Sequence, residues 1–182
     1  MSIIRPFNFK QWIDENRHLL KPPVGNKVVY ENTEFIVMVV GGPNSRKDYH
    51  FNESEEFFYQ LEGNITVKIQ EDGKAVEVSI NEGDIFLLPP NVPHNPVRPA
   101  NTIGLVMERK RRPKEKDGLL WFCEKCNHKL YENYFTLTNI MTQFQETFNY
   151  FYNNDNLKTC KNCGHKMEPP VAIANTSKTE SH

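Results

Sequence analysis

Three side chains have the types and spacing to hold a catalytic metal ion: His50, Glu56 and His94. Two imidazoles and one carboxylate on one face of an ion leave the opposite positions open, as in non-haem Fe(II) oxygenases. A closed ligand set would bind a metal without leaving room for a substrate. A lone histidine in a strand-rich chain is more often a hydrogen-bonded core residue, but these three residues together predict an open ferrous site.

Two short apolar segments are expected to carry these ligands to one place. Residues 57–61 are mostly aromatic and end at a Gly-Asn turn, so Glu56 should open a strand. Residues 85–88 are apolar and stop at two prolines, which cannot donate hydrogen bonds to a central ladder. His94 follows the next turn and can point back, while His50 lies beyond an acidic loop. The two segments are therefore interpreted as two edges of one metal pocket in a small β-barrel.

The surrounding sequence predicts a mainly β protein with one helix at its start. Residues 6–20 have the pattern of an amphipathic helix capped by Asn8. Further strands are expected at residues 28–30, 35–40, 65–70, 75–80, 96–98 and 103–108. Short strands separated by Gly, Pro and Asn are typical of an antiparallel sandwich, jelly roll or barrel.

Four cysteines form a second predicted metal site. They occur as two C-x-x-C pairs, Cys123, Cys126, Cys160 and Cys163. Each pair forms a tight turn that aims two sulfurs at one point, and two such turns give a closed tetrahedral site suited to zinc or iron. Free or redox-active thiols are the alternative. With four thiolates and no open position, the site is expected to be structural.

The segment between the cysteine pairs is longer than a minimal zinc ribbon needs. Within residues 139–152, Ile140, Phe144, Phe148 and Phe151 recur at helical spacing. We therefore expect a helix that the cysteine-bound metal pins against the barrel.

The two ligand segments resemble the motifs of the cupin superfamily. The first motif is matched by His50, Glu56 and Gly63, with Asn52 where a second histidine is common. The second is matched by Gly83, Pro89 and His94, with Asn91 where glycine is usual. The resemblance implies a cupin double-stranded β-helix (jelly-roll) barrel, and Asn52 leaves a set of two histidines and one carboxylate.

Longer stretches resemble the 3-hydroxyanthranilate 3,4-dioxygenase family, from about residue 5 to residue 170. The matching stretches are residues 41–50, 56–63, 85–89, 92–98 and 104–109. The resemblance implies that Fe(II) and O2 open the ring of 3-hydroxyanthranilate to 2-amino-3-carboxymuconate semialdehyde. That product closes to quinolinate on the kynurenine route from tryptophan to NAD. The resemblance also implies a four-cysteine, rubredoxin-like site that holds Fe or Zn away from the catalytic centre, as in bacterial and fungal members of the family. Members with this site are expected to be dimers.

The resemblance also implies roles for individual residues. Arg46 matches the family arginine near the dioxygen site, and Arg98 matches the arginine that binds the substrate carboxylate. Glu108 matches a carboxylate that contacts the substrate amine or hydroxyl, and Glu56 is both a metal ligand and a neighbour of the substrate. By residue type alone, such an arginine more often pairs on the surface and such a glutamate more often faces solvent.

Bulk properties exclude some classes of partner. Lys and Arg number 22 against 23 Asp and Glu, so no overall field attracts nucleic acid or an anionic membrane. The apolar runs are far too short to span a bilayer, and the first residues lack the apolar stretch of a signal peptide. A cytoplasmic protein is therefore expected. The expectation of a homodimer rests on the resemblance alone.

We expect a cupin barrel over residues 1–112, a four-cysteine segment over 113–170 and a flexible tail over 171–182. The basic run 109–118 is interpreted as a solvated linker between the first two, with a nuclear-localisation or anion-binding patch as alternatives. Three other functions stay open: another cupin dioxygenase, acting for example on cysteine or a flavonol, a cupin binding protein without turnover, and a zinc-ribbon interaction module.

Overall fold

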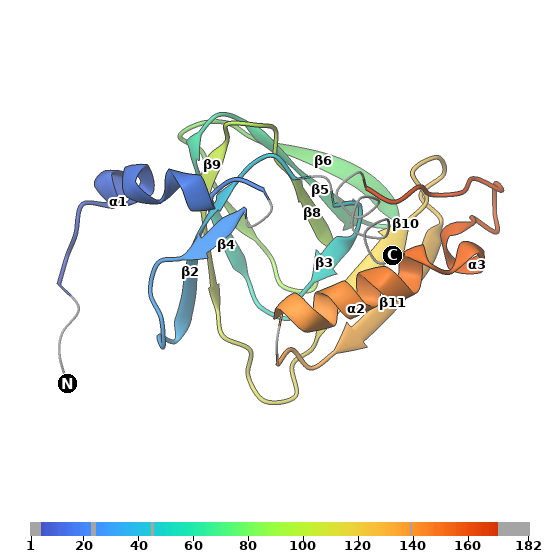
Figure 1. The fold of residues 1–182 in the computed structure, drawn as a ribbon. Coiled ribbons are helices and arrows are strands. Elements are labelled where there is room, and N and C mark those ends of the chain that lie inside the picture. Colours follow the sequence, from blue (N-terminus) through green and yellow to red (C-terminus); the bar gives the residue numbers. More distant parts are fainter. Residues whose placement is uncertain (1–4, 23–24, 45, 139, 171–182) are drawn as a thin grey trace, which may run out of the picture.

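The computed structural model describes residues 5–22, 25–44, 46–138 and 140–170. Two antiparallel sheets pack face to face (Figure 1). In spatial order the first sheet holds β1 (Asn26–Val28), β2 (Phe35–Gly41), β9 (Ile103–Arg109), β4 (Glu56–Glu62) and β7 (Ile85–Leu88). The second holds β11 (Lys129–Phe135), β10 (Asp117–Phe122), β3 (Tyr49–Phe51), β8 (His94–Val97), β5 (Ile65–Glu71) and β6 (Lys74–Ile80). The expected mainly β, cupin-like fold is confirmed.

The space between the sheets is filled by alternate residues of the strands. Phe58 on β4, Val67 on β5, Leu88 on β7 and Val106 on β9 are all at most 3% exposed. Because side chains alternate across a strand, the same register turns Glu56 of β4 inward beside this apolar cluster. The core therefore fixes the direction of a predicted metal ligand.

The predicted N-terminal helix is present as α1 (Phe9–Asn16), followed by a 3₁₀ turn over Arg17–Leu19. The Asn8 side chain accepts a hydrogen bond from the backbone N–H of Gln11, which confirms Asn8 as the cap. Ile13 of α1 and Leu20 after the 3₁₀ turn pack on the outer face of the first sheet, against Val39.

Most predicted strands are confirmed, including the paired strands β5 and β6. The strand expected at residues 28–30 lies at Asn26–Val28, where it pairs with β2. The strand predicted at 96–98 in fact begins at His94, because His94 pairs with β3 on one side and with β5 on the other. His50 lies beyond the loop 52–55, as expected, and it stands in the middle of the three-residue strand β3, which was not predicted. That strand is flanked by β8 and β10.

The C-terminal segment extends the second sheet. The strands β10 and β11 were not predicted; β10 pairs with β3, and β11 lies at the sheet edge. The predicted helix is confirmed as α2 (Ile140–Tyr152), which runs alongside these strands and is followed by α3 (Asp155–Lys158) (Figure 1). Trp121 of β10 stacks on Phe151 of α2 with 4.4 Å between ring centroids, and its Nε1–H donates to the Tyr152 hydroxyl at 3.2 Å. A second apolar core therefore joins α2 to the sheet.

The basic run is only partly the solvated linker that we expected. Lys110 and Arg112 are exposed, but the Arg111 side chain is 9% exposed and ion-paired with Glu108 and Asp117. Burial of a guanidinium with two carboxylates makes this segment part of the packed structure. The division at residue 112 stays a prediction, and the tail 171–182 lies outside the described residues. Within the ranges described, no helix combines the length and apolar character needed to cross a membrane.

Candidate active site

The structure brings His50, Glu56 and His94 together. His50 on β3 and His94 on β8 are paired across the second sheet, and Glu56 opens β4 in the facing sheet. One potential ligand atom from each lies within 4.8 Å of the others. The sequence placed these three residues in one pocket, and their side chains do converge between the two sheets.

The ring orientation of His94 is set by the backbone. Its Nδ1 lies 3.0 Å from the carbonyl oxygen of Val92, which can only accept, so Nδ1 carries a proton and Nε2 is the nitrogen that faces the site. That Nε2 lies 3.0 Å from Oε2 of Glu56. Burial would raise the pKa of the Glu56 carboxyl, but His94 outweighs burial and lowers it. Burial lowers the pKa of His94, but Glu56 outweighs burial and raises it, so in the metal-free protein Nε2 donates a proton to the ionised Glu56. A metal ion bound between the two groups would take the place of that proton.

Asn52 ties two carboxylates together at this site. Its Nδ2 donates to Oε2 of Glu108 at 3.1 Å and reaches Oε2 of Glu56 at 3.5 Å. Glu108 is 7% exposed, and burial together with the nearby charge of Glu56 raises its pKa to about 7. Asn52 therefore stands where a second histidine is common in cupins, and its amide orients the carboxylates of Glu56 and Glu108.

Arg98 brings a buried positive charge to the interior. It is 2% exposed, and its Nη1 donates to Oε1 of Gln60 at 3.3 Å. Across the described part of the chain, no carboxylate forms an ion pair with it, and burial lowers its pKa to about 10. A Cβ on Gly104 would lie 2.8 Å from Arg98 Nη1, so a larger residue there would displace the guanidinium from its present position. Such an unpaired cation suits an anionic ligand.

Arg46 lies at the edge of the site, with 43% of its side chain exposed. It pairs with the buried carboxylate of Asp48 through its Nε at 3.0 Å, and its guanidinium lies 5.3 Å from the ring centroids of both Phe144 and Phe148. The Phe144 ring is also 5.6 Å from that of His50. The structure therefore places Arg46 between α2 and the barrel interior rather than in hydrogen-bond contact with the three ligands.

Sequence reasoning missed several residues of this site. Asp48, Asn52, Gln60 and Asp117 are all at most 3% exposed and all bonded to a candidate residue. The one signal for Asp48 was its spacing of two residues from His50, which puts both on the same side of an extended chain. For Asp117 the sequence offered no signal, because it stands at the end of a charged run.

The four cysteines form the closed site predicted from their spacing. All four sulfurs lie within 4.8 Å of one another, with Cys123 and Cys163 at 3.6 Å and Cys126 and Cys160 at 3.5 Å. A tetrahedral ion with bonds of about 2.3 Å holds its sulfurs about 3.8 Å apart. None of the four forms a disulfide. The geometry therefore fits a thiolate-bound metal.

The two cysteine turns have the same backbone pattern. In the first, the N–H of Cys123 donates to the carbonyl of His128, and that of Asn127 donates back to Cys123. In the second turn Cys160, His165 and Gly164 take the corresponding places. Asn127 and Gly164 both have φ near +60° to +75°, the left-handed conformation expected for them.

The first cysteine turn is fastened to the barrel. Asn127 exchanges hydrogen bonds of 2.8 and 3.0 Å with the side chain of Gln70 on β5 and donates to the carbonyl of Gly73. A cavity of about 520 Å³ lies beside this contact and is lined by Arg46 and Lys47 as well as by the cysteine turn. The thiolate site is therefore close to the loop that carries Arg46.

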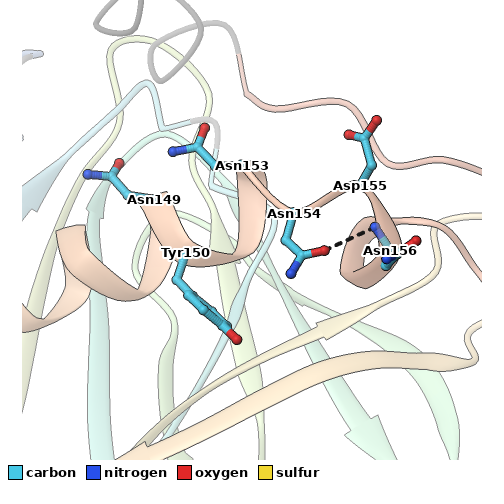
Figure 2. A pocket seen from close by; sticks show the side chains of 6 residues that line it. All are labelled: Asn149, Tyr150, Asn153, Asn154, Asp155 and Asn156. Carbon is cyan, nitrogen blue, oxygen red and sulfur yellow. Dashed lines mark hydrogen bonds between the residues drawn. The ribbon is translucent and has the colours of Figure 1, made fainter.

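A second hollow, of about 600 Å³, lies where α2 meets α3 (Figure 2). It is lined by Asn149, Tyr150, Asn153, Asn154, Asp155 and Asn156. Figure 2 shows that these side chains spread apart rather than meet, and Asn154 is used to cap α3 through the N–H of Asn156 at 3.1 Å. The hollow contains none of the candidate site residues.

A cupin-like fold with an open site of two histidines and one glutamate, plus a separate four-thiol site, defines a metal-binding cupin. The family described as 3-HAO, 3-hydroxyanthranilic acid dioxygenase, matches residues 1–152 of the 182. The chain belongs to this dioxygenase family.

Individual relatives agree. A 3-hydroxyanthranilate 3,4-dioxygenase of Xanthomonas campestris is 53% identical over 172 residues, covering 94% of this chain and 97% of the relative. One of Bacillus cereus is 48% identical over 169 residues, covering 92% and 94%. A cupin-2 domain protein of Shewanella frigidimarina, with 15% identity and a TM-score of 0.46, covers 57% of this chain and 94% of that one. The family assignment rests on the sequence matches alone.

Proposed function

We propose that this chain catalyses the O2-dependent ring opening of 3-hydroxyanthranilate to 2-amino-3-carboxymuconate semialdehyde, the precursor of quinolinate in NAD synthesis by the kynurenine route. The observation that carries the proposal is the convergence of His50, Glu56 and His94 beside the unpaired cation of Arg98. The relatives named 3-hydroxyanthranilate 3,4-dioxygenase support the choice of substrate.

The three ligands would hold Fe(II). Two imidazoles and one carboxylate are the donor set of non-haem Fe(II) oxygenases, and the Val92 carbonyl has already selected the His94 tautomer that can bind. Fe(II) held by these residues would supply binding positions for the substrate and O2 and would lift the spin restriction on their direct reaction. The protein then has to place the ring and balance its charge.

Arg98 and Glu108 would orient the substrate. The Arg98 guanidinium binds the ring carboxylate, because a planar fork of donors matches a carboxylate and no protein acid competes for it within the described residues. Glu108, held by Asn52 and Arg111, contacts the neighbouring amine or hydroxyl, and Glu56 lies beside the same ring edge. These contacts would fix which ring bond opens.

Arg46 would act on the dioxygen side of the site. Asp48 and the rings of Phe144 and Phe148 hold its guanidinium at the boundary between α2 and the barrel. From there its charge favours the negative charge that develops on oxygen.

The four-cysteine site would hold a structural zinc or iron ion. A full set of thiolates leaves no position for a substrate, and both cysteine turns are closed by backbone hydrogen bonds. Thiols arranged for a metal rather than for disulfides support a reducing, cytoplasmic location.

We also propose that the chain works as a homodimer through the outer face of the first sheet. Ile85 and Leu87 of β7 are 68% and 53% exposed, and they pair in register with Tyr59 and Phe57 of β4. Such a contiguous apolar face is typical of an interface. Leu87→Lys should give a monomer by light scattering, and an unchanged dimer would exclude this face.

The decisive experiment mixes the purified protein with Fe(II), O2 and 3-hydroxyanthranilate and follows the semialdehyde chromophore. We expect turnover by the native chain, and neither turnover nor Fe(II) binding by His50→Ala, Glu56→Ala or His94→Ala, each still folded by circular dichroism. If the iron-loaded chain ignores this substrate and turns over another, the substrate assignment is wrong. If it binds ligands without any turnover, it is a binding protein.

A further inference from the structure

The connection between β9 and β10 delivers a fully buried carboxylate to a metal ligand. Asp117 is 0% exposed, and its Oδ1 lies 2.8 Å from Nε2 of His50. Asp117 lies two residues before Leu119, which is the register partner of His50 in the β10–β3 pair. The carboxylate is therefore carried by the strand that neighbours the ligand-bearing strand.

Arg111 holds this carboxylate in place. Its Nη2 donates to Oδ1 of Asp117 at 2.6 Å and its Nε to Oδ2 at 2.9 Å, so the fork engages both oxygens. A carboxylate gripped in this way by a guanidinium is ionised and can only accept from His50. The proton of the neutral imidazole is then fixed on the nitrogen facing Asp117, and the other nitrogen keeps its lone pair.

The same guanidinium reaches the opposite side of the site. Nη1 of Arg111 donates to Oε2 of Glu108 at 2.7 Å, and that oxygen also accepts from Asn52, whose Nδ2 extends to Glu56. The chain of contacts therefore starts at one metal ligand and returns to another. An ion pair that only stabilised the fold would not need contacts to His50 at one end and to Glu56 at the other.

We propose that Asp117, clamped by Arg111, is a positioning residue that orients His50 and fixes the tautomer in which it binds the metal ion. Partners of this kind on a metal-binding histidine typically change metal affinity 10- to 100-fold when they are removed. The basic run 109–118 thereby has a part in the active site through Arg111.

This inference rests on the proposed Fe(II) site, and the experiment separates the two. Fe(II) affinity is measured anaerobically by chelator competition, together with the visible spectrum of the Co(II)-loaded protein and the melting temperature of the metal-free protein. The variants are Asp117→Asn and Arg111→Lys. Lysine keeps the positive charge of Arg111 but lacks the planar guanidinium that binds both oxygens of Asp117. Arg112→Lys is the matched control, because Arg112 is exposed.

We expect Asp117→Asn to weaken Fe(II) binding about 10- to 100-fold and to shift the Co(II) spectrum, since the ligand field of His50 changes. Arg111→Lys should do the same to a smaller extent, and Arg112→Lys should change neither readout. Affinity within twofold of the native value and an unchanged spectrum, with only a lower melting temperature, would overturn the inference. If Asp117→Asn does not fold, Arg111→Lys decides by the same criteria. If the native chain binds no better than His94→Ala, the metal assignment itself fails.

Discussion

Arg98 carries a positive charge and is almost fully buried. These two properties predict opposite effects of its removal on substrate binding and on stability. Replacing it with methionine removes the proposed partner of the substrate carboxylate, and hydrogen bonds between charged groups contribute about 1.5–3 kcal/mol. We therefore expect Arg98→Met to raise KM about 10- to 100-fold. Because Gln60 is the one side-chain partner of the guanidinium among the described residues, the melting temperature should stay level or rise. Steady-state kinetics and thermal melts check both.

The combination of the two results matters for Arg98. A higher KM with a large loss of stability would mean that Arg98 holds the fold and reaches the substrate only indirectly. An unchanged KM would exclude it from carboxylate binding.

Glu115 forms an ion pair whose pH dependence can be worked out. Two hydrogen bonds from the Arg109 guanidinium lower the pKa of Glu115 to about 2, below its ordinary value of 4.5. The stability that this partly exposed pair contributes, about 1 kcal/mol, is therefore present above pH 4.5 and lost as pH falls towards 2.

Glu115→Gln should thus be less stable than the native chain at pH 7, and the gap should narrow below pH 4.5. Urea denaturation at several pH values measures it. A gap that stays constant with pH would mean that the charge of Glu115 contributes nothing.

At the scale of elements, α2 places a pair of aromatic rings under the Arg46 guanidinium. Phe144→Leu keeps the apolar volume but removes one ring face, and a cation–π contact contributes about 0.5–2 kcal/mol. We expect a rise of roughly 2- to 30-fold in KM for O2, with KM for the aromatic substrate little changed. Tyr150→Leu on the same helix, 58% exposed, is the control. A rise in both KM values alike would indicate a displaced helix instead.

The elements that sequence reasoning predicted are those with local signals. Glu56 at the head of β4, the helix with Phe144 and Phe148, and the two cysteine turns all follow from spacing within a few residues. The strand β3 was missed because three residues carry too little pattern, and β10 because its long-range pairing buries both of its faces.

The same limit applied to the charged connection. Arg109–Gly118 has the composition of a solvated linker, and only the fold shows that Arg111 turns inward to two acids. A single sequence does not reveal which member of a basic run has distant partners.

For the whole molecule, the four-cysteine site should govern stability rather than chemistry. Cys160→Ser removes a ligand of the proposed structural metal, whose binding would contribute folding free energy, so we expect a fall in melting temperature of roughly 10 °C or more and lower solubility. Turnover per folded molecule, assayed well below the melting temperature, should be nearly native. Lost activity at unchanged stability and substrate affinity would show that this metal takes part in catalysis.

The short strand that bears His50 lies between β8, which comes before residue 113, and β10, which comes after it. A fragment that stopped before residue 113 would keep all three candidate metal ligands in its sequence, yet it would leave one side of β3 without the hydrogen-bond partners that β10 supplies. A bare edge of this kind invites pairing between molecules. The catalytic half is therefore not a module that can be excised or transplanted, and shortening the chain there should yield aggregates rather than a smaller enzyme.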